Sequence, residues 1–559
     1  LSTFAHMGDV YLFHDLHGYI MKMSPDVIAV LDAFAPVAET ASVAQRFAGA
    51  FEGQSPESFI DVFQQFACLL EPDEDELANL WPMVVVKGRW NVWHRGDDGC
   101  LTLYTAWGAT SSQSPVRHHR LSAAETRMWD DLDGERRLAE LRDGHGHDAA
   151  GLLALIQRLA HSDVQAVKLS PLPMKVFSGR RNLVPAYLTS TMPYARWTSG
   201  DPIAPPVSPG LPPSTSTEQY HREVIADADA QFDHQETTLS HLFREPHPAL
   251  GGRSYGQALV DALAARSALP VAGTIRVLEI GGGLGYVAAA VSRALLARQL
   301  DVRYEIIELA PALAAAQRRR CAGLPVTVRD GDALVAPLDD AAYHLIIANE
   351  MIGDLPAVAL GHAEVGAGAE LEPAARQALL ARLGEVGELI DELGLVLDDA
   401  PDPFYLNVGA MALVRRLARA LAPGGTAVLT EFGERSQYPR LSTHLDHPEL
   451  SIHFGHLERV AERAGLRCAF EFVIDLLDLD RAQEGLATTR SYFRALGGLL
   501  AEHGVSLEKI GYTRSTFDAL LAGKLAPGAI GELHFDKIED RLMGLSPHEF
   551  KALVLTRPR

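Results

Sequence analysis

The chain has 559 residues, 47% of them hydrophobic and 22% charged, so several domains are expected and the composition is that of a soluble globular protein. No apolar run is long enough to cross a bilayer, and we expect no membrane partner. The formal net charge of −22 disfavours nucleic acid as a partner; it favours cationic substrates or simply keeps the protein in solution. Four scattered cysteines without a C-x-x-C pair indicate a cytoplasmic protein.

The first expected domain, residues 1–80, begins with a hairpin and continues with helices. Short strands are predicted at Asp9–His14 and Gly18–Met23. Three helical patterns follow, from Pro25 to Phe34, from Ser42 to Phe51 with a Ser42-x-x-Gln45 capping box, and from Ser55 to Leu70.

This hairpin followed by three helices resembles a PqqD-like domain, the peptide-recognition element of enzymes that modify ribosomally made peptides. The resemblance implies a precursor peptide or protein as partner, recognised through a leader segment. A small sheet with an exposed edge can accept such a segment as an additional strand. A domain that only packs, or that forms a homodimer, is the alternative.

A second small α+β module is expected at residues 81–175, with strands first and helices after them. Its predicted strands are Val84–Trp93, Cys100–Tyr104 and Gln165–Leu169, and its helices lie near residues 121–129, 137–141 and 148–159. Residues 176–235 are expected to form a proline-rich linker and a connecting helix. The proline-rich part could instead lie across the catalytic domain and cover its site.

The segment from Val277 to Gly285 predicts a buried strand that enters a glycine-rich turn, and a helix follows from Tyr286 to Leu296. Glycines allow close approach of the backbone to a ligand, and a helix start offers unpaired N–H groups. The turn alone would also suit an NAD or FAD enzyme. The bulky Tyr286 occupies the position where the dinucleotide pattern requires a small residue.

Three further strands each end in polar groups: Tyr304–Glu308, Val326–Asp332 and His344–Glu350. In an open α/β sheet such strand ends line one crevice. This order resembles the class I S-adenosylmethionine (SAM) methyltransferases. We therefore predict an α/β, Rossmann-like methyltransferase domain at residues 236–559, with a helical insertion at 360–400 and a closing strand at Phe550–Thr556.

The resemblance implies SAM as the cofactor, with the glycines near its methionine portion, Glu308 near the ribose and Asp332 near the adenine. The expected cofactor-binding residues are Tyr255, Glu279, Gly281, Gly282, Gly283, Gly285, Glu308, Leu309, Asp332, Ala333 and Asn349.

A narrower resemblance rests on Ala348–Pro356, which is similar to the Asn-Glu-x-x-Asp-x-Leu-Pro signature of the MidA-like family of methyltransferases. Three other segments resemble segments of that family: Glu308–Leu313 with Gln317, Thr430–Gly433, and Glu449–His453. Three departures stand out: Gly353 replaces the signature's Asp, Glu431 replaces another Asp, and the family's Thr-Gln-Gly segment has no counterpart.

The MidA-like resemblance implies methylation of an arginine side chain in a peptide or protein. The expected catalytic residues are Glu350, Asp354, His453 and Glu431. Paired carboxylates can bind a guanidinium and leave one of its nitrogens nucleophilic. Carboxylate O-methylation, histidine N-methylation and a non-catalytic SAM-binding assembly factor are the alternatives. No metal site is expected, because the histidines at 444, 447, 453 and 456 fit no standard zinc spacing.

Overall fold

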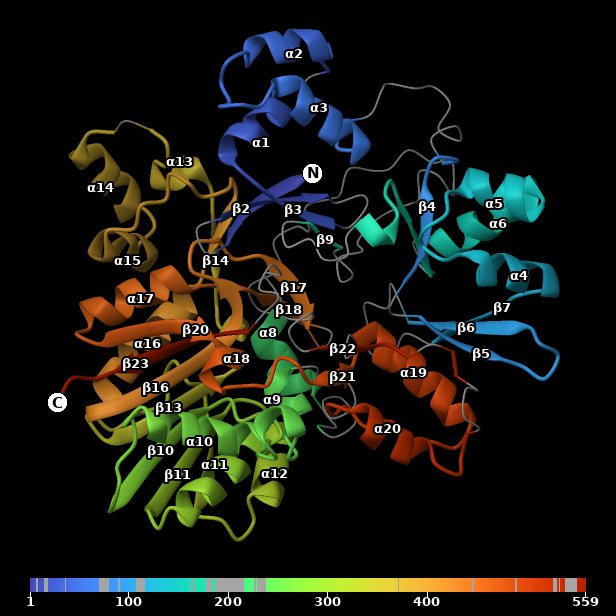
Figure 1. Cartoon of the computed structure of the whole chain (residues 1–559). Helices are drawn as coiled ribbons and strands as arrows, with labels where there is room; N and C mark the ends of the chain where they lie inside the picture. The colour runs from blue at the N-terminus through green and yellow to red at the C-terminus, as the bar shows by residue number, and fades with distance from the viewer. Residues whose placement is uncertain are drawn as a thin grey trace.

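The computed structural model describes residues 1–6, 9–14, 19–35, 37–69, 80–88, 91–106, 116–161, 164, 166–176, 183–185, 216–225, 228, 238–369, 371–444, 447–487, 490–525, 530–531, 533–537 and 550–559. A large mixed sheet forms the main core, and smaller α+β units lie beside it (Figure 1). Among the described residues, no helix is both long and apolar enough to cross a membrane.

Seven strands of this sheet follow the order β12-β11-β10-β13-β16-β23-β20. Their bounds are β10 Thr274–Ile280, β11 Asp301–Glu308, β12 Val326–Asp330, β13 Tyr343–Asn349, β16 Leu421–Glu434, β20 Arg467–Phe472 and β23 Phe550–Thr556. Strands β12 to β16 are parallel, whereas β23 runs antiparallel to both β16 and β20. The predicted Rossmann-like core and its closing strand are confirmed.

Both faces of the sheet are buried, which explains why its central strands are continuous apolar runs. Along β10, Ile275 and Val277 face a core shared with α10 (Tyr255–Ala265) and α11 (Tyr286–Ala297). The alternate residues Leu278 and Ile280 face a second core shared with α16 (Val408–Ala420) and α17 (Phe454–Arg463). Strand β10 lies between β11 and β13, so the chain direction of the crossovers reverses there and a crevice opens at the carboxyl ends of the strands.

The remaining core elements extend this sheet. Helices α12 (Pro311–Arg320) and α18 (Val473–Leu476) and the short strand β19 (Ile452–His453) flank it, and β17 (Leu441–His444) pairs with β18 (His447–Leu450). The helical insertion consists of α13 (His362–Val365), α14 (Pro373–Ala381) and α15 (Glu385–Leu393). It is enclosed by the paired strands β14 (Val358–Leu360) and β15 (Phe404–Leu406).

The N-terminal unit is a four-stranded sheet with three helices. Its order is β1-β2-β3-β9, with β1 Ser2–His6, β2 Asp9–His14, β3 Tyr19–Met23 and β9 Leu183–Pro185. The helices are α1 Pro25–Asp32, α2 Thr40–Arg46 and α3 Pro56–Gln65. The hairpin and helices were expected, but β1 and β9 were not. The predicted capping box at Ser42 is wrong, because α2 begins two residues earlier, after Glu39.

One strand predicted for the second module is wrong. The apolar run from Val84 to Trp93 forms two strands in different sheets: the first ends at Lys87, one residue before Gly88, whose N–H still donates to the Ala166 carbonyl (2.9 Å), and the second begins at Val92. Strand β4 (Val84–Lys87) pairs with β8 (Val167–Ser170), and β5 (Val92–Arg95), β6 (Leu101–Thr105) and β7 (Arg117–Arg120) form the other sheet. The helices are α4 (Ala123–Asp131), α5 (Leu138–His145) and α6 (Ala149–Ala160).

The second module packs against a segment inserted before β23. This segment contains β21 (Glu484–Leu486), α19 (Arg490–Glu502), α20 (Arg514–Leu521) and β22 (Phe535–Lys537). Val92 and Tyr104 of the module share its apolar core, and the Tyr104 hydroxyl donates to the Glu502 carboxylate (2.7 Å). Figure 1 shows α19 beside β5 and β6, away from the large sheet.

Candidate active site

The glycine turn begins where β10 ends, and its backbone is left-handed at Gly281, Gly283 and Gly285, with φ values of 66°, 49° and 81°. At Gly282 a Cβ atom would lie 3.0 Å from the side chain of Ile306 and 3.2 Å from that of Gln317. The turn is therefore tightly wound and closely packed at Gly282, whereas a Cβ atom at Gly283 would meet nothing within 4 Å.

Glu308, the last residue of β11, is almost completely buried beside this turn. Its carboxylate accepts hydrogen bonds from the backbone N–H of Ala310 (3.0 Å) and from the Gln317 side chain (2.7 Å). The same Gln317 nitrogen also donates to the Gly283 carbonyl (2.9 Å), so it joins the carboxylate to the turn. Burial raises the pKa of Glu308. Each carboxylate oxygen keeps a further acceptor position.

Two adjoining cavities, which we call the inner lobe and the outer lobe, open at this edge of the sheet. The inner lobe, about 120 Å³, lies along the glycine turn and reaches Glu279, Asn349 and Glu350. The outer lobe, about 190 Å³, extends over Asp332 and on to Tyr405. Residues shared by both are His221, Gly281, Glu308, Met351 and Asp354. They form one continuous crevice.

Beyond β13, polar side chains are fixed in place by a hydrogen-bond network. The Asn349 side-chain oxygen accepts from the Tyr255 hydroxyl (2.7 Å) and from Thr430 (2.9 Å). Glu350 has a φ of 54°, which is unusual for a residue other than glycine, and its N–H donates to the Thr430 carbonyl (2.9 Å). Its carboxylate accepts from Ser240 (2.5 Å). Strained backbone held by its surroundings is typical of functional positions.

The departure from the family signature at Gly353 has a steric cause. A Cβ atom there would lie 2.8 Å from the Leu450 carbonyl and 3.1 Å from the Glu449 side chain. The Gly353 N–H donates to the carboxylate of Glu431, which is fully buried (3.1 Å). Burial and the neighbouring charge of Glu449 raise the pKa of Glu431 well above its usual range. Asp354 instead faces both lobes and approaches His221, with 3.2 Å between carboxylate and imidazole.

Replacing Gly353 by aspartate, the residue of the MidA-like signature, is expected to destabilise the fold by about 2–4 kcal/mol, since it adds volume and a third carboxylate beside Glu431 and Glu449. Urea unfolding measures the loss. Gly353→Ala adds the Cβ without the charge and should lose less. Equal stability of Gly353→Asp and wild type would contradict the steric explanation.

His453 lies apart from the crevice. It caps α17, where its Nδ1 accepts from the His456 N–H (3.2 Å), and its ring stacks on that of His456 at 3.6 Å. Burial lowers the pKa of His453 to about 4, so the ring is neutral at physiological pH. Its expected catalytic role stays a prediction, now without a direct contact to either lobe.

The other expected residues divide into two groups. Most of them line the two lobes: Glu279, Gly281, Gly282, Gly283, Glu308, Leu309, Asp332, Ala333, Asn349, Glu350 and Asp354. Tyr255, Gly285 and Glu431 do not line a lobe; Tyr255 and Glu431 contact the lining from behind through Asn349 and Gly353.

Glu279, in the inner lobe, makes the free energy of unfolding depend on pH in a predictable way. Burial raises its pKa from an ordinary value of 4.5 to about 7, although its carboxyl accepts a hydrogen bond from Tyr304 (2.8 Å). Because the folded state holds this proton to a higher pH than the unfolded state, the contribution of Glu279 to stability is fully present below pH 4.5. It is lost as the pH rises to about 7. Glu279→Gln should therefore gain up to about 3 kcal/mol over wild type across that interval. Urea unfolding at several pH values checks this, and a constant difference would contradict it.

Sequence patterns did not identify several residues that line the crevice, among them His221, Ser240, Met351 and Tyr405. His221 belongs to the five-residue π-helix Tyr220–Val224 that follows α8 (Ser216–Gln219). Both elements lie in the segment expected to be linker, and Thr217 and Glu218 of α8 also line the outer lobe. Ser240 belongs to α9 (Leu239–Leu242). Residues 216–224, at the end of this segment, thus contribute to the lining of the crevice, whereas the proline-rich residues 199–215 lie outside the described part of the chain.

No protein-family model and no curated protein matches the chain. Among solved structures, two proteins of the COG1565 superfamily from Burkholderia thailandensis are similar. One is described as uncharacterised (18% identity, 61% of this chain and 87% of that chain, TM-score 0.34). The other is described as a likely methyltransferase bound to S-adenosyl-homocysteine (18% identity, 59% of this chain and 80% of that chain, TM-score 0.33).

A phosphoethanolamine N-methyltransferase of Haemonchus contortus in complex with S-adenosyl-L-methionine is also similar (13% identity, 63% of this chain and 61% of that chain, TM-score 0.32). At these TM-scores the similarity carries no argument about activity.

Proposed function

We propose that the chain is a SAM-dependent methyltransferase that modifies a side chain of a peptide or protein. The observation that carries the proposal is the two-lobed crevice, which brings the glycine turn, Glu308, Asp332 and Glu350 together at the carboxyl ends of β10 to β13.

The residues of the crevice fit the cofactor. The turn leaves open backbone beside the inner lobe, where an amino-acid portion could lie against the start of α11. Glu308 offers acceptor positions to a ribose, and the backbone around Asp332 and Ala333 lines the outer lobe beside it. When bound, SAM supplies a methyl group on a sulfonium; the protein's part is to hold the acceptor in line with it and to take up a proton.

Arginine is the leading acceptor in this proposal. Glu350 and Asp354 both face the inner lobe, and two such carboxylates can bind a guanidinium while one of its nitrogens remains exposed. His221 lies beside Asp354 and is suited to position the acceptor. Carboxylate O-methylation and histidine N-methylation of a peptide remain the competing reactions, and a non-catalytic SAM-binding factor is the competing class.

Two measurements separate these candidates. Calorimetry with SAM, S-adenosylhomocysteine and NAD tests the cofactor, and binding of NAD alone would overturn the proposal. Mass spectrometry of peptides incubated with SAM locates any added methyl group on arginine, on another side chain or on none.

Leader recognition by the N-terminal unit is a further part of the proposal, and β9 restricts how it could work. Strand β9 pairs antiparallel with β3, so the chain's own residues Leu183–Pro185 take that edge of the sheet. Among the described strands, a leader that adds a strand must therefore pair with the outer edge of β1 or of β9, or displace β9 from β3.

Removing residues 1–80 is expected to raise the KM for full-length peptide by about tenfold or more, because a tethered acceptor is locally concentrated, while SAM affinity stays unchanged. Methylation kinetics and calorimetry measure the two effects. Replacing Leu183–Pro185 with three glycines weakens β9 selectively and should tighten leader binding if β3 is the edge used. An unchanged KM after truncation would rule out leader recognition.

A further inference from the structure

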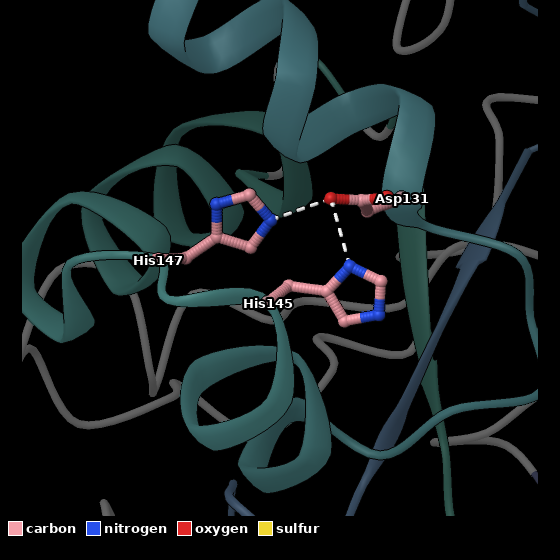
Figure 2. A group of neighbouring side chains, drawn as sticks. All are labelled: Asp131, His145 and His147. Carbon is pink, nitrogen blue, oxygen red and sulfur yellow. Dashed lines mark hydrogen bonds and ion pairs between the residues drawn. The ribbon is translucent and has the colours of Figure 1, made fainter.

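A cluster of two histidines and one aspartate lies in the second module, on other elements than the crevice. Asp131 is the last residue of α4, His145 is the last residue of α5, and His147 lies in the turn before α6. Gly146, between the histidines, ends α5 in the left-handed conformation with a φ of 66°. This turn brings both imidazoles towards the same carboxylate oxygen (Figure 2).

The three ligand-type atoms are close enough to share one ion. The carboxylate oxygen of Asp131 lies 3.3 Å from Nδ1 of His145 and 2.7 Å from Nε2 of His147. All three atoms lie within 4.8 Å of one another. Ligands bound to zinc at about 2.1 Å in a tetrahedron are about 3.4 Å apart, so the 3.3 Å contact already fits and the 2.7 Å contact has to open.

We propose that Asp131, His145 and His147 bind a divalent transition-metal ion of the zinc class, with water at the fourth position. Two imidazoles and a carboxylate are a donor set typical of zinc. The side chains are 30%, 35% and 12% exposed, respectively, so an ion can reach them from solvent. The bound ion would tie the end of α4 to the turn between α5 and α6.

Arg136 competes with a metal ion for the ligand atoms of this cluster. Its guanidinium hydrogen-bonds Nε2 of His145 and also donates to the Asp131 carbonyl (3.0 Å). Nε2 of His145 therefore acts as the acceptor and the proton lies on Nδ1, the atom that must bind the metal. Metal binding requires the other tautomer and the release of His145 from Arg136, which can keep its hydrogen bonds to Asp133 (2.7 Å) and to the Asp131 carbonyl. Asp148 is not one of the proposed ligands, because its carboxylate caps α6 by accepting from the Gly151 N–H (2.7 Å).

The test is a titration of the chelator-treated full-length protein with zinc chloride, in competition with a chromogenic chelator. Wild type should bind one equivalent at this site. His147→Ala and Asp131→Asn should each weaken that binding at least about tenfold. Arg136→Ala should strengthen it, since the competing hydrogen bond is removed. Cobalt(II) should give the visible spectrum of a tetrahedral site in wild type and lose it in His147→Ala.

The matched control is His94→Ala, because His94 and His503 form another imidazole pair, with ring centroids 5.2 Å apart, and it should bind zinc like wild type. Zinc should raise the Tm of wild type and of His94→Ala but not that of His147→Ala, since an ion that binds only the native state stabilises it. Absence of saturable zinc binding, or equal binding by wild type and His147→Ala, would overturn the proposal and leave a hydrogen-bonded cluster only.

Discussion

Glu350→Gln is expected to lower kcat by about 10²–10⁴-fold while SAM affinity stays near wild type. The side chain lies in the inner lobe, and its backbone is held at a positive φ by the Thr430 carbonyl, so glutamine occupies nearly the same place. The substitution removes the negative charge that would bind a guanidinium and accept its proton. Single-turnover kinetics with a peptide that wild type methylates measure the effect.

Ser240→Ala is the companion variant for that experiment. Ser240 donates to the Glu350 carboxylate (2.5 Å), so its loss should cost less than the loss of the charge and should shift the pH profile. Full activity of Glu350→Gln would contradict a role for this carboxylate in the reaction.

Glu308→Ala is expected to weaken binding of SAM and S-adenosylhomocysteine by about 1–3 kcal/mol, roughly 5–150-fold. The variant removes the acceptor proposed for the ribose and releases Gln317, which also holds the Gly283 carbonyl. Calorimetry measures the affinity.

Glu305→Ala is the matched control for the cofactor experiment. Glu305 lies on the same strand, where it pairs with Tyr343 (2.9 Å) and Arg329 (2.9 Å), and it lines neither lobe. It should bind SAM like wild type. Unchanged affinity of Glu308→Ala would contradict the proposed placement of the ribose.

The large sheet could be predicted because its strands are buried on both faces and end in a glycine turn or in polar residues. Glu308, Asp332 and Asn349 follow directly from that pattern, since the carboxyl ends of neighbouring parallel strands meet. The strand break at Gly88 could not be found in this way. An apolar run shows that residues are buried, but not in which sheet each of them pairs.

The covering residues of the crevice were missed for a different reason. His221 and Ser240 come from short helices of four or five residues, and the helical pattern of the connecting segment does not show which of its side chains reach the crevice. Strand β9, with three residues, is also too short, and its partner β3 lies 160 positions earlier. Such elements form because tertiary contacts select them.

The position of β23 has a consequence for how the protein assembles. Strand β16 ends at Glu434, but its neighbour β23 begins only at Phe550, after the whole segment that carries α19 and α20. While the chain is being synthesised, β16 and β20 therefore emerge with unpaired edges on either side of a missing strand. Apolar edges of this kind recruit other chains. We expect nascent or truncated forms that lack β23 to depend on chaperones and to aggregate, even though every residue of the proposed SAM site is already present.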